Sequence, residues 1–348
     1  MLSSTVSAFF DRLLQSNHTF HNNVVLITGG ARGLGLVMAR DFAAEGARLI
    51  LVSRDAQELA NAATELRHTT EVLTIQADLT QEDQPARVIE QAYARFGRID
   101  VLVNNAGVIQ AGPLDHMEEA DFARAMDIHF WAPLRLMRAV APRMREHDGG
   151  RIVNISSIGG RIAVPHLLPY CASKFALTGL SDGMRAELAP HNIKVTTVNP
   201  GLMRTGSHVN AQFRGRHELE YAWFTLLDSL PFTSVDARHA SREIVEACRR
   251  GQPQLTISLQ AKALYAISGL VPNLIGHGLT IMNALLPDPT DARGDETRSG
   301  WESRSAVVPA LLTALSDRAT VENNGMVQRD NPAAEPDVPA TPVVSETM

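Results

Sequence analysis

The chain has 348 residues, a formal net charge of −6 and a hydrophobic fraction of 45%. The acidic balance argues against nucleic acid as the main partner, and the apolar fraction is ordinary for a soluble globular protein. The two cysteines, Cys171 and Cys248, provide no disulfide framework, so a reducing cytoplasm is the expected compartment. No cluster has the spacing of a metal site, and no metal is expected.

Residues 1–22 predict an amphipathic helix followed by a polar link. Its apolar face would carry Val6, Phe9, Phe10, Leu13 and Leu14. The segment lacks the basic start and the unbroken apolar core of a secretory signal. Two interpretations stay open: the helix packs on its own domain or a partner subunit, or it docks on a membrane surface.

Strands and helices alternate along residues 23–260. The run "VVLIT" at 24–28 is apolar throughout, as a strand buried on both faces should be. Further strands are predicted at 48–53, 71–78, 99–105, 151–157, 193–200 and 254–258. Helices are predicted at 35–46, 55–67, 81–96, 118–146, 168–189 and 236–251. These repeated βα units predict an α/β fold: a single Rossmann-like domain with a doubly wound parallel sheet and helices on both faces.

The alternation loosens after residue 202. Within the 23–260 domain, residues 202–235 mix aromatic, charged and apolar residues and are expected to form a mobile substrate cover. Residues 261–287 predict an apolar helical segment, too interrupted for a membrane span, that extends the pocket, buries a dimer contact or docks on lipid. Residues 288–348 are polar and later rich in proline, which predicts a disordered tail.

The sequence "TGGARGLG" at 28–35 joins the first strand to the first helix of the domain. Glycines at 29, 33 and 35 let the backbone approach a pyrophosphate closely, and the N-terminus of the helix supplies N–H donors and a positive dipole. A glycine pattern between a strand and a helix is the signature of a dinucleotide site.

The end of the second strand indicates which dinucleotide binds. An acidic residue there would hold a ribose 2′-hydroxyl, but the strand closes with Ser53 and is followed by Arg54. Arg32 lies inside the glycine loop, and two guanidiniums favour a 2′-phosphate. The predicted cofactor is therefore NADP(H) rather than NAD(H), with Asp55 expected to cap the next helix. The alternative is that both arginines are merely solvated.

The sequence "YCASK" places Tyr170 and Lys174 one helical turn apart. Arginine is used nearly everywhere else in this chain, so a lysine at 174 indicates that a compact ammonium is needed beside the phenol. The ammonium would favour the phenolate and lower the pKa of Tyr170 from its usual value near 10. Ser157, at the end of a strand, would donate a hydrogen bond to a substrate oxygen, whereas Ser156 is expected to be structural.

These motifs together resemble the short-chain dehydrogenase/reductase family. The matching segments are "TGGARGLG", "NNAG" at 104–107, Ser157, "YCASK" and "NPG" at 199–201, in that order. The resemblance covers residues 23–260 and implies hydride transfer between a nicotinamide and a carbonyl or secondary alcohol. Ser157, Tyr170 and Lys174 would be catalytic. Cofactor contacts would come from Thr28, Gly29, Arg32, Gly33, Leu34, Gly35, Ser53, Arg54, Asp78, Leu79, Asn104, Asn105, Ala106, Gly107, Tyr170, Lys174, Pro200, Gly201 and Thr205.

One position departs from the family pattern. Where an asparagine usually helps to hold a water in a proton relay, "MDIHFWAPL" places His129. A histidine there can hold the water or relay a proton as a fourth catalytic residue. It can equally signal weaker activity, or be a buried structural residue.

The substrate and the partners are less sharply predicted. An aromatic and apolar set suggests a bulky apolar carbonyl or alcohol substrate of steroid, retinoid, lipid or polycyclic type, unless these residues only cover the core. The set comprises Phe213, Tyr221, Trp223, Phe224, Leu226, Leu227 and Phe232. A carbonyl reductase that forms a homodimer or homotetramer is expected, with contact to a membrane surface as an option. The alternative is a catalytically weakened NADP(H)-binding regulatory or scaffold protein of the same fold.

Overall fold

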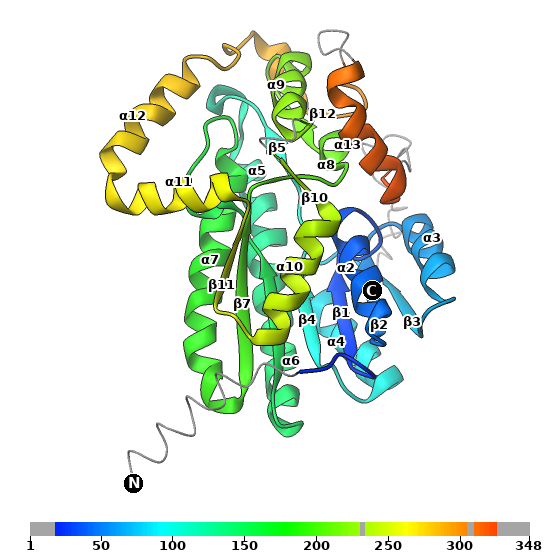
Figure 1. The fold of residues 1–348 in the computed structure, drawn as a ribbon. Coiled ribbons are helices and arrows are strands. Elements are labelled where there is room, and N and C mark those ends of the chain that lie inside the picture. Colours follow the sequence, from blue (N-terminus) through cyan, green and yellow to red (C-terminus); the bar gives the residue numbers. More distant parts are fainter. Residues whose placement is uncertain (1–17, 230–233, 305–309, 326–348) are drawn as a thin grey trace, which may run out of the picture.

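The computed structural model describes residues 18–229, 234–304 and 310–325. Within these residues a seven-stranded parallel sheet forms the centre, in the order β11-β7-β6-β4-β1-β2-β3 (Figure 1). The strands are β1 (Val24–Thr28), β2 (Arg48–Ser53), β3 (Val72–Gln76), β4 (Val101–Asn104), β6 (Gly150–Ile155), β7 (Ile193–Pro200) and β11 (Gln254–Ile257). The predicted Rossmann-like, doubly wound architecture is confirmed.

Helices cover both faces of the sheet. One apolar cluster joins the sheet to α2 (Gly33–Ala44), α3 (Ala56–Leu66) and α10 (Ala237–Arg250). A second cluster on the other face includes α4 (Gln84–Phe96), α6 (Ala132–Glu146) and the C-terminal part of α7 (Leu168–Leu188). All five residues of β1 are buried, because a central strand between two helical layers has no face in water.

The strand order reverses between β1 and β4, and the loops that follow these two strands border the crevice where this class of fold binds ligands. The two loops are tied together. The side-chain amide of Asn105 donates to the carbonyl oxygens of Thr28 and Gly29, at 2.9 and 3.2 Å. The Thr28 hydroxyl accepts hydrogen bonds from the backbone N–H groups of Asn105 and Ala106. The sequence motifs 28–35 and 104–107 therefore meet at one edge of the sheet.

Residues 202–235 contain more regular structure than the predicted mobile cover implies. Their elements are β8 (Leu202–Arg204), α8 (Ser207–Asn210), β9 (Gln212–Phe213), α9 (His217–Ser229) and β10 (Ser234–Asp236). Strand β9 pairs with β5 (Gln110–Ala111) and with β12 (Arg298–Ser299), so a piece of the C-terminal region completes a small sheet here.

Other short elements connect these layers. Helix α5 (Glu119–Met126) runs through a π-helical turn at Asp127–Trp131 directly into α6. Single 3-10 turns occupy Leu114–His116, Ile158–Gly160, Ala189–His191 and Ala292–Asp295. The π-turn matters for the site because it carries His129.

The predicted N-terminal helix falls largely on residues 1–17, outside the described residues. Residues 18–22 are not helical. Phe20 is fully buried, with its ring 5.0 Å from the ring of Phe42 on α2 and under the guanidinium of Arg249. This short stretch therefore packs on the domain itself.

The C-terminal region separates into two parts that Figure 1 shows on opposite sides of the molecule. Helices α11 (Leu259–Leu270) and α12 (Pro272–Asn283) stand away from the sheet. Helix α13 (Ala310–Glu322) lies next to α9 and ends close to α2 and α3. The prediction of disorder from residue 288 onward is thus wrong for 292–299 and 310–322, where the structure has a 3-10 turn, a strand and a helix.

Candidate active site

Tyr170 and Ser157 meet at the carboxyl end of the sheet. Ser157 follows β6 and caps the turn Ile158–Gly160, its hydroxyl oxygen accepting from the N–H of Gly159 at 3.0 Å. Tyr170 lies in the first turn of α7 and forms a hydrogen bond with Ser157. Ser156 contacts Thr178 and the carbonyl oxygen of Lys174 instead, in agreement with its predicted structural role. The structure therefore brings together the two hydroxyls that the sequence paired.

The phenol of Tyr170 is less acidic than predicted. Burial raises its pKa to about 12, although the hydrogen bond with Ser157 acts in the opposite direction. Lys174 was expected to lower this pKa. Its Nζ atom lies 5.6 Å from the ring centroid of Tyr170 and donates to the carbonyl oxygen of Ile155 at 2.8 Å. The predicted acidification is wrong for this structure, because desolvation of the phenol dominates.

Lys174 is itself strongly perturbed. The side chain is only 5% exposed, and burial lowers its pKa to about 7. A lysine with this pKa gains or loses its charge near neutral pH, so small changes in its surroundings alter the field at the phenol. The sequence placed Lys174 on the same helical face as Tyr170, but the burial of its side chain is a property of the fold.

His129 is held as a neutral, structural side chain. The N–H of Val108 donates to Nε2 at 3.1 Å, so the proton of the ring sits on Nδ1, which lies 2.8 Å from the Ser173 hydroxyl. Ser173 in turn donates to the carbonyl oxygen of Tyr170. The ring is 1% exposed, and burial together with Lys174 holds its pKa well below 6.5.

Both nitrogens of His129 are thus occupied by protein groups, which favours the structural alternative over a proton relay. The ring meets that of Tyr170 edge-on at 5.5 Å, so it packs behind the phenol. It also explains a glycine of the "NNAG" motif. A Cβ atom on Gly107 would stand 2.7 Å from His129 Nε2, too close for any larger residue.

The glycine loop has the geometry that a dinucleotide needs. Gly29 and Gly33 adopt positive φ angles of 62° and 53°, which L side chains rarely tolerate. A Cβ atom on Gly35 would lie 2.0 Å from the carbonyl oxygen of Gly29, so only glycine lets α2 start this close to β1. Beside Gly33 the nearest atom to an added Cβ is the Thr205 carbonyl oxygen at 3.8 Å, which leaves room on that side. These residues fit a pyrophosphate at the N-terminus of α2.

The predicted 2′-phosphate site contains a residue that sequence reasoning missed. Glu58, on α3, is 2% exposed, and its carboxylate lies 3.2 Å from the Arg32 guanidinium and 3.3 Å from the Ser53 hydroxyl. Asp55 caps α3 as predicted, accepting from the N–H of Glu58. Arg54 is exposed. The signal for Glu58 was its place in the first turn of a capped helix, three residues after the cap.

The remaining predicted cofactor residues lie near the same edge of the sheet, at strand ends or in the loops that follow them. Asp78 accepts hydrogen bonds from the backbone and side chain of Thr80, and Leu79 is buried. The side-chain amide of Asn104 donates to Asn154 inside the sheet. Pro200 closes β7, and Gly201 and Thr205 follow it. Leu34 begins α2 beside Gly33. The structure thus places Asn104 and Asn105 as braces of the crevice.

A family model described as short chain dehydrogenase matches residues 23–214, more than half of the chain. The chain belongs to the short-chain dehydrogenase/reductase family. The resemblance drawn from the five motifs is thus confirmed.

Named relatives agree with this family. Dehydrogenase/reductase SDR family member 7B of Mus musculus is 38% identical over 58% of this chain, and the match spans 64% of that relative's length, less than two thirds. 11-beta-hydroxysteroid dehydrogenase 1A of Arabidopsis thaliana is 31% identical over 79% of this chain and 81% of the relative. L-sorbose reductase of Gluconobacter frateurii, solved with NADPH and L-sorbose, is 25% identical, with a TM-score of 0.62 over 69% of this chain and 97% of the other.

The substrate side of this short-chain dehydrogenase/reductase is a packed aromatic cluster. Phe213, Tyr221 and Phe224 are each 5% exposed or less. They pack with Cys171, Leu167 and the ring of Tyr170. This packing favours the alternative in which these three aromatics cover the core. Trp223, Leu226 and Leu227 are partly exposed, and Phe232 lies outside the described residues.

A buried polar chain, which the sequence did not reveal, fastens this cluster to the segment before Tyr170. Glu220 is fully buried. One of its oxygens lies 2.8 Å from Nδ1 of His166, and the other accepts from the indole N–H of Trp223 at 2.7 Å. Helix α9 is thereby anchored to His166, four residues before Tyr170.

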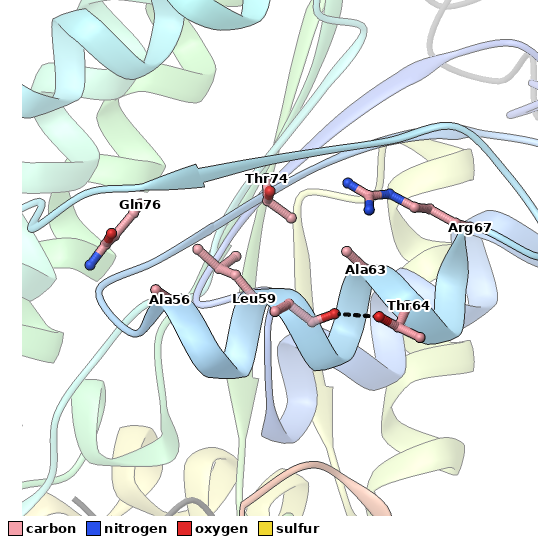
Figure 2. A pocket seen from close by; sticks show the side chains of 8 residues that line it. Ala56, Leu59, Ala63, Thr64, Arg67, Thr74 and Gln76 are labelled. Atoms are coloured by element: carbon pink, nitrogen blue, oxygen red, sulfur yellow. Dashed lines mark hydrogen bonds between the residues drawn. The ribbon is translucent and has the colours of Figure 1, made fainter.

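A separate hollow of about 380 Å³ lies between α3 and β3 (Figure 2). Leu59 and Ala63 of α3 face Thr74 of β3 across it, with Gln76 at one end and Arg67 at the other. None of the residues predicted for catalysis or cofactor binding lines this hollow, so it forms no part of the site.

Proposed function

We propose that the protein is an NADP(H)-dependent carbonyl reductase or alcohol dehydrogenase that uses Tyr170 as its proton donor and acceptor. The observation that carries this proposal is the hydrogen bond between Ser157 and Tyr170, with the Lys174 ammonium over the same ring. When bound, the nicotinamide supplies or accepts hydride. Ser157 and Tyr170 orient the substrate oxygen, and Tyr170 gives it a proton as negative charge develops there.

The pKa values support this division of roles. With a pKa raised to about 12 by burial, Tyr170 keeps its proton at neutral pH and is ready to donate it to an alkoxide. Lys174, whose pKa burial lowers to about 7, is poised to become charged beside a phosphate-bearing ligand and then to stabilise the phenolate that remains.

The test is the Tyr170→Phe variant, assayed with NADPH and a panel of ketones. Loss of a general acid predicts a fall in kcat/KM of roughly 100- to 10,000-fold with an unchanged affinity for NADPH. Tyr93→Phe is the matched control, because this phenol lies on α4 and packs against Arg143 and His147 rather than against a predicted site residue. Equal residual rates in the two variants defeat the assignment of Tyr170.

The preference for NADP(H) is supported by Arg32 and Arg54 at the end of the adenosine crevice. It is also supported by the relative solved with NADPH. Glu58 pairs with Arg32 and holds its guanidinium at this position. Replacing Arg32 by Ala should weaken NADPH binding about tenfold or more while leaving NADH binding nearly unchanged, since only NADPH carries the 2′-phosphate. Arg67→Ala, an exposed arginine on α3, is the control; an equal loss for both cofactors contradicts the preference.

We further propose a bulky apolar carbonyl or alcohol as substrate. The partly exposed Trp223, Leu226 and Leu227 of α9 support it, as does a relative named for a hydroxysteroid. Steroid and retinoid ketones should be reduced with a higher kcat/KM than a ketose such as L-sorbose. The opposite ranking counts against an apolar pocket.

The assembly and location are also proposed. Trp131 and Phe175, on the π-turn and α7, remain 42% and 43% exposed, which supports burial in a homodimer or homotetramer. Both cysteines are unpaired, which suits a reducing compartment. No helix among the described residues is long and apolar enough to cross a membrane. The exposed apolar helices α11 and α12 support docking on a membrane surface instead.

One observation favours the alternative function, a weakened NADP(H)-binding regulatory protein. His129 stands at the usual relay position with both nitrogens engaged, so it has no free atom to hold a relay water. This alternative predicts NADPH binding with turnover equally low in the unchanged protein and in Tyr170→Phe.

A further inference from the structure

The end of the chain's last described helix lies on the predicted phosphate site. We call residues 316–325, the last turns of α13 and the turn after it, the strap. The backbone N–H of Gly33 donates to the carbonyl oxygen of Asn323 at 2.9 Å. The side-chain amide of Asn324 donates to the carbonyl oxygens of Ala31 and Glu58, at 2.9 and 3.1 Å. The strap thus binds the glycine loop and the residue that pairs with Arg32.

The strap also contacts the opposite wall of the crevice. Gly206 follows Thr205, a predicted cofactor contact, and has a φ of 82°. A Cβ atom on Gly206 would lie 2.7 Å from the Cα atom of Thr320, so the two backbones touch. Thr320 and Asn323 are only 1% and 5% exposed. The strap therefore lies between the glycine loop and the turn after β8, where a pyrophosphate would pass.

Polar contacts on α2 and α3 hold this end of the strap. Arg40 donates to the Asn323 side chain at 3.1 Å and to the carbonyl oxygen of Glu322 at 2.9 Å. The amide of Asn61 donates to that of Asn324. Figure 1 shows α13 ending beside both helices. The bonds to the side chains of Asn323 and Asn324 require amide groups at these two positions. They therefore indicate a specific interface between the strap and the two helices.

The other end of the strap is attached to the substrate cover. Ser316 is fully buried and accepts from the Ser229 hydroxyl of α9 at 3.0 Å. Asp317 lies 3.7 Å from the buried His208, whose other nitrogen lies 3.6 Å from Asp228. One segment therefore spans the cofactor crevice and the cover over the substrate side.

We propose that the strap is a built-in competitor of the nicotinamide cofactor, occupying the phosphate cradle until the cofactor displaces it. The Gly33 N–H is the first backbone donor of α2 and has no partner within the helix. A donor of this kind is what a phosphate oxygen binds at the N-terminus of a helix. A carbonyl oxygen already accepts its hydrogen bond, and a phosphate cannot share that position.

This inference rests on the proposed function, because a competitor matters only if the crevice binds a dinucleotide. Its consequence is quantitative. The apparent dissociation constant equals the intrinsic one divided by the fraction of molecules whose strap is open. Anything that loosens the strap therefore tightens cofactor binding, without any change in the residues that touch the cofactor.

The test compares NADPH affinity in the full-length protein and in the double variant Asn323→Ala and Asn324→Ala. The variant loses the side-chain bonds to Arg40, Ala31 and Glu58 but leaves the glycine loop intact. We expect the dissociation constant of NADPH to fall by about tenfold. Val321→Ala is the matched control, since this strap side chain is 61% exposed and should change the constant by less than about twofold.

Hydrogen exchange gives a second, independent measurement on the unchanged protein. Saturating NADPH should speed exchange of the amides of residues 316–325 while slowing exchange in the glycine loop. Slower exchange in the strap would show that it closes over the cofactor and would overturn the proposal. Equal NADPH affinity in the double variant and the unchanged protein would overturn it as well. If none of these proteins binds NADPH or NADH, the proposed function itself fails.

Discussion

The two helical segments beyond the sheet, α11–α12 and the strap, end in opposite environments. Residues 259–286, the arm, carry Leu259, Leu270 and Leu285 at 79%, 81% and 81% exposure, and α12 has no buried residue. The strap is polar, yet Ser316, Thr320 and Asn323 are buried against the domain. The apolar arm is thus exposed to solvent, whereas the polar strap is packed against the domain.

The difference teaches that burial follows from available partners as well as from hydrophobicity. The strap finds matched donors and acceptors in a crevice that is already polar, so its amides replace their water hydrogen bonds at little cost. In the arm, Ala261 is the one buried residue of α11 and α12, and the Arg161 guanidinium lies over the Tyr265 ring. Helices of 12 residues are marginal in water by themselves, so the arm requires a covering surface to be stable.

The largest effect should come from making the arm polar. Leu270→Glu with Leu285→Glu should reduce partitioning onto vesicles of phosphatidylcholine and phosphatidylglycerol by about 100-fold or more, since each leucine contributes about 1.5–3 kcal/mol on burial. The arm carries Lys262 and no carboxylate, which suits an anionic surface. Vesicle flotation measures the partitioning.

The control for the arm adds the same charges at polar positions. Asn273→Glu with Asn283→Glu places two carboxylates on exposed sites of α12. It should lower partitioning far less than the leucine variant. If the unchanged protein does not bind vesicles, or if both variants lose binding equally, the arm is not a lipid-docking surface and its contrast with the strap needs another explanation.

A smaller effect should appear as the pH is changed. Burial lowers the pKa of His208, but Asp228 of α9 and Asp317 of α13 outweigh it and raise the pKa above 6.5. The other charged and aromatic groups around this site are Arg204, Tyr221 and Arg304. Protonated His208 therefore stabilises the strap fully below pH 6.5, and this contribution is lost as the pH rises through the raised pKa.

Because loss of the His208 charge loosens the strap, NADPH should bind roughly three- to tenfold more tightly at pH 8.5 than at pH 6. Lys174 also titrates near pH 7, so the quantity to measure is the ratio of dissociation constants between His208→Gln and the unchanged protein at each pH. If this ratio does not vary with pH, His208 does not hold the strap closed. The proposed role of the strap contacts at Gly33 would be unaffected.

The smallest effect is expected at the surface of the strap. Arg238 lies 3.1 Å from Glu322, but the two side chains are 65% and 36% exposed. Exposed ion pairs of this kind contribute little, so Arg238→Ala should change NADPH affinity by less than about threefold. A larger change, measured by the same titration, would mean that surface charge rather than the buried amides holds the strap closed.

The sequence pattern was sufficient to predict the strands of the sheet and the relative position of Tyr170 and Lys174. The run at 24–28 is apolar because both faces of its strand are covered, and the run at 193–200 is rich in β-branched residues. They form β1 and β7 with the predicted limits. Tyr170 and Lys174 had to share a face of one helix, since residues four apart always do. Such local rules hold wherever the chain folds.

The sequence pattern could not predict contacts between residues that are distant in the chain. Nothing in "MDIHFWAPL" shows that Val108 and Ser173 will occupy both nitrogens of His129. The buried pairing of Glu58 with Arg32 was equally hidden. The pKa of Tyr170 was predicted in the wrong direction, because a four-residue spacing reveals a neighbouring charge but not the loss of water.

By itself, the order of motifs determined the family and the sheet and predicted the hydroxyls of Ser157 and Tyr170 as catalytic, because each depends on short-range geometry repeated along the backbone. Only the tertiary structure decided that a polar segment near residue 320 returns to the glycine loop, where Asn323 bonds Gly33 from 290 residues further along the chain. Side-chain amides and backbone carbonyls carry no periodic signature. These amides and carbonyls form hydrogen bonds with whichever polar groups the fold brings close to them and leaves without another partner.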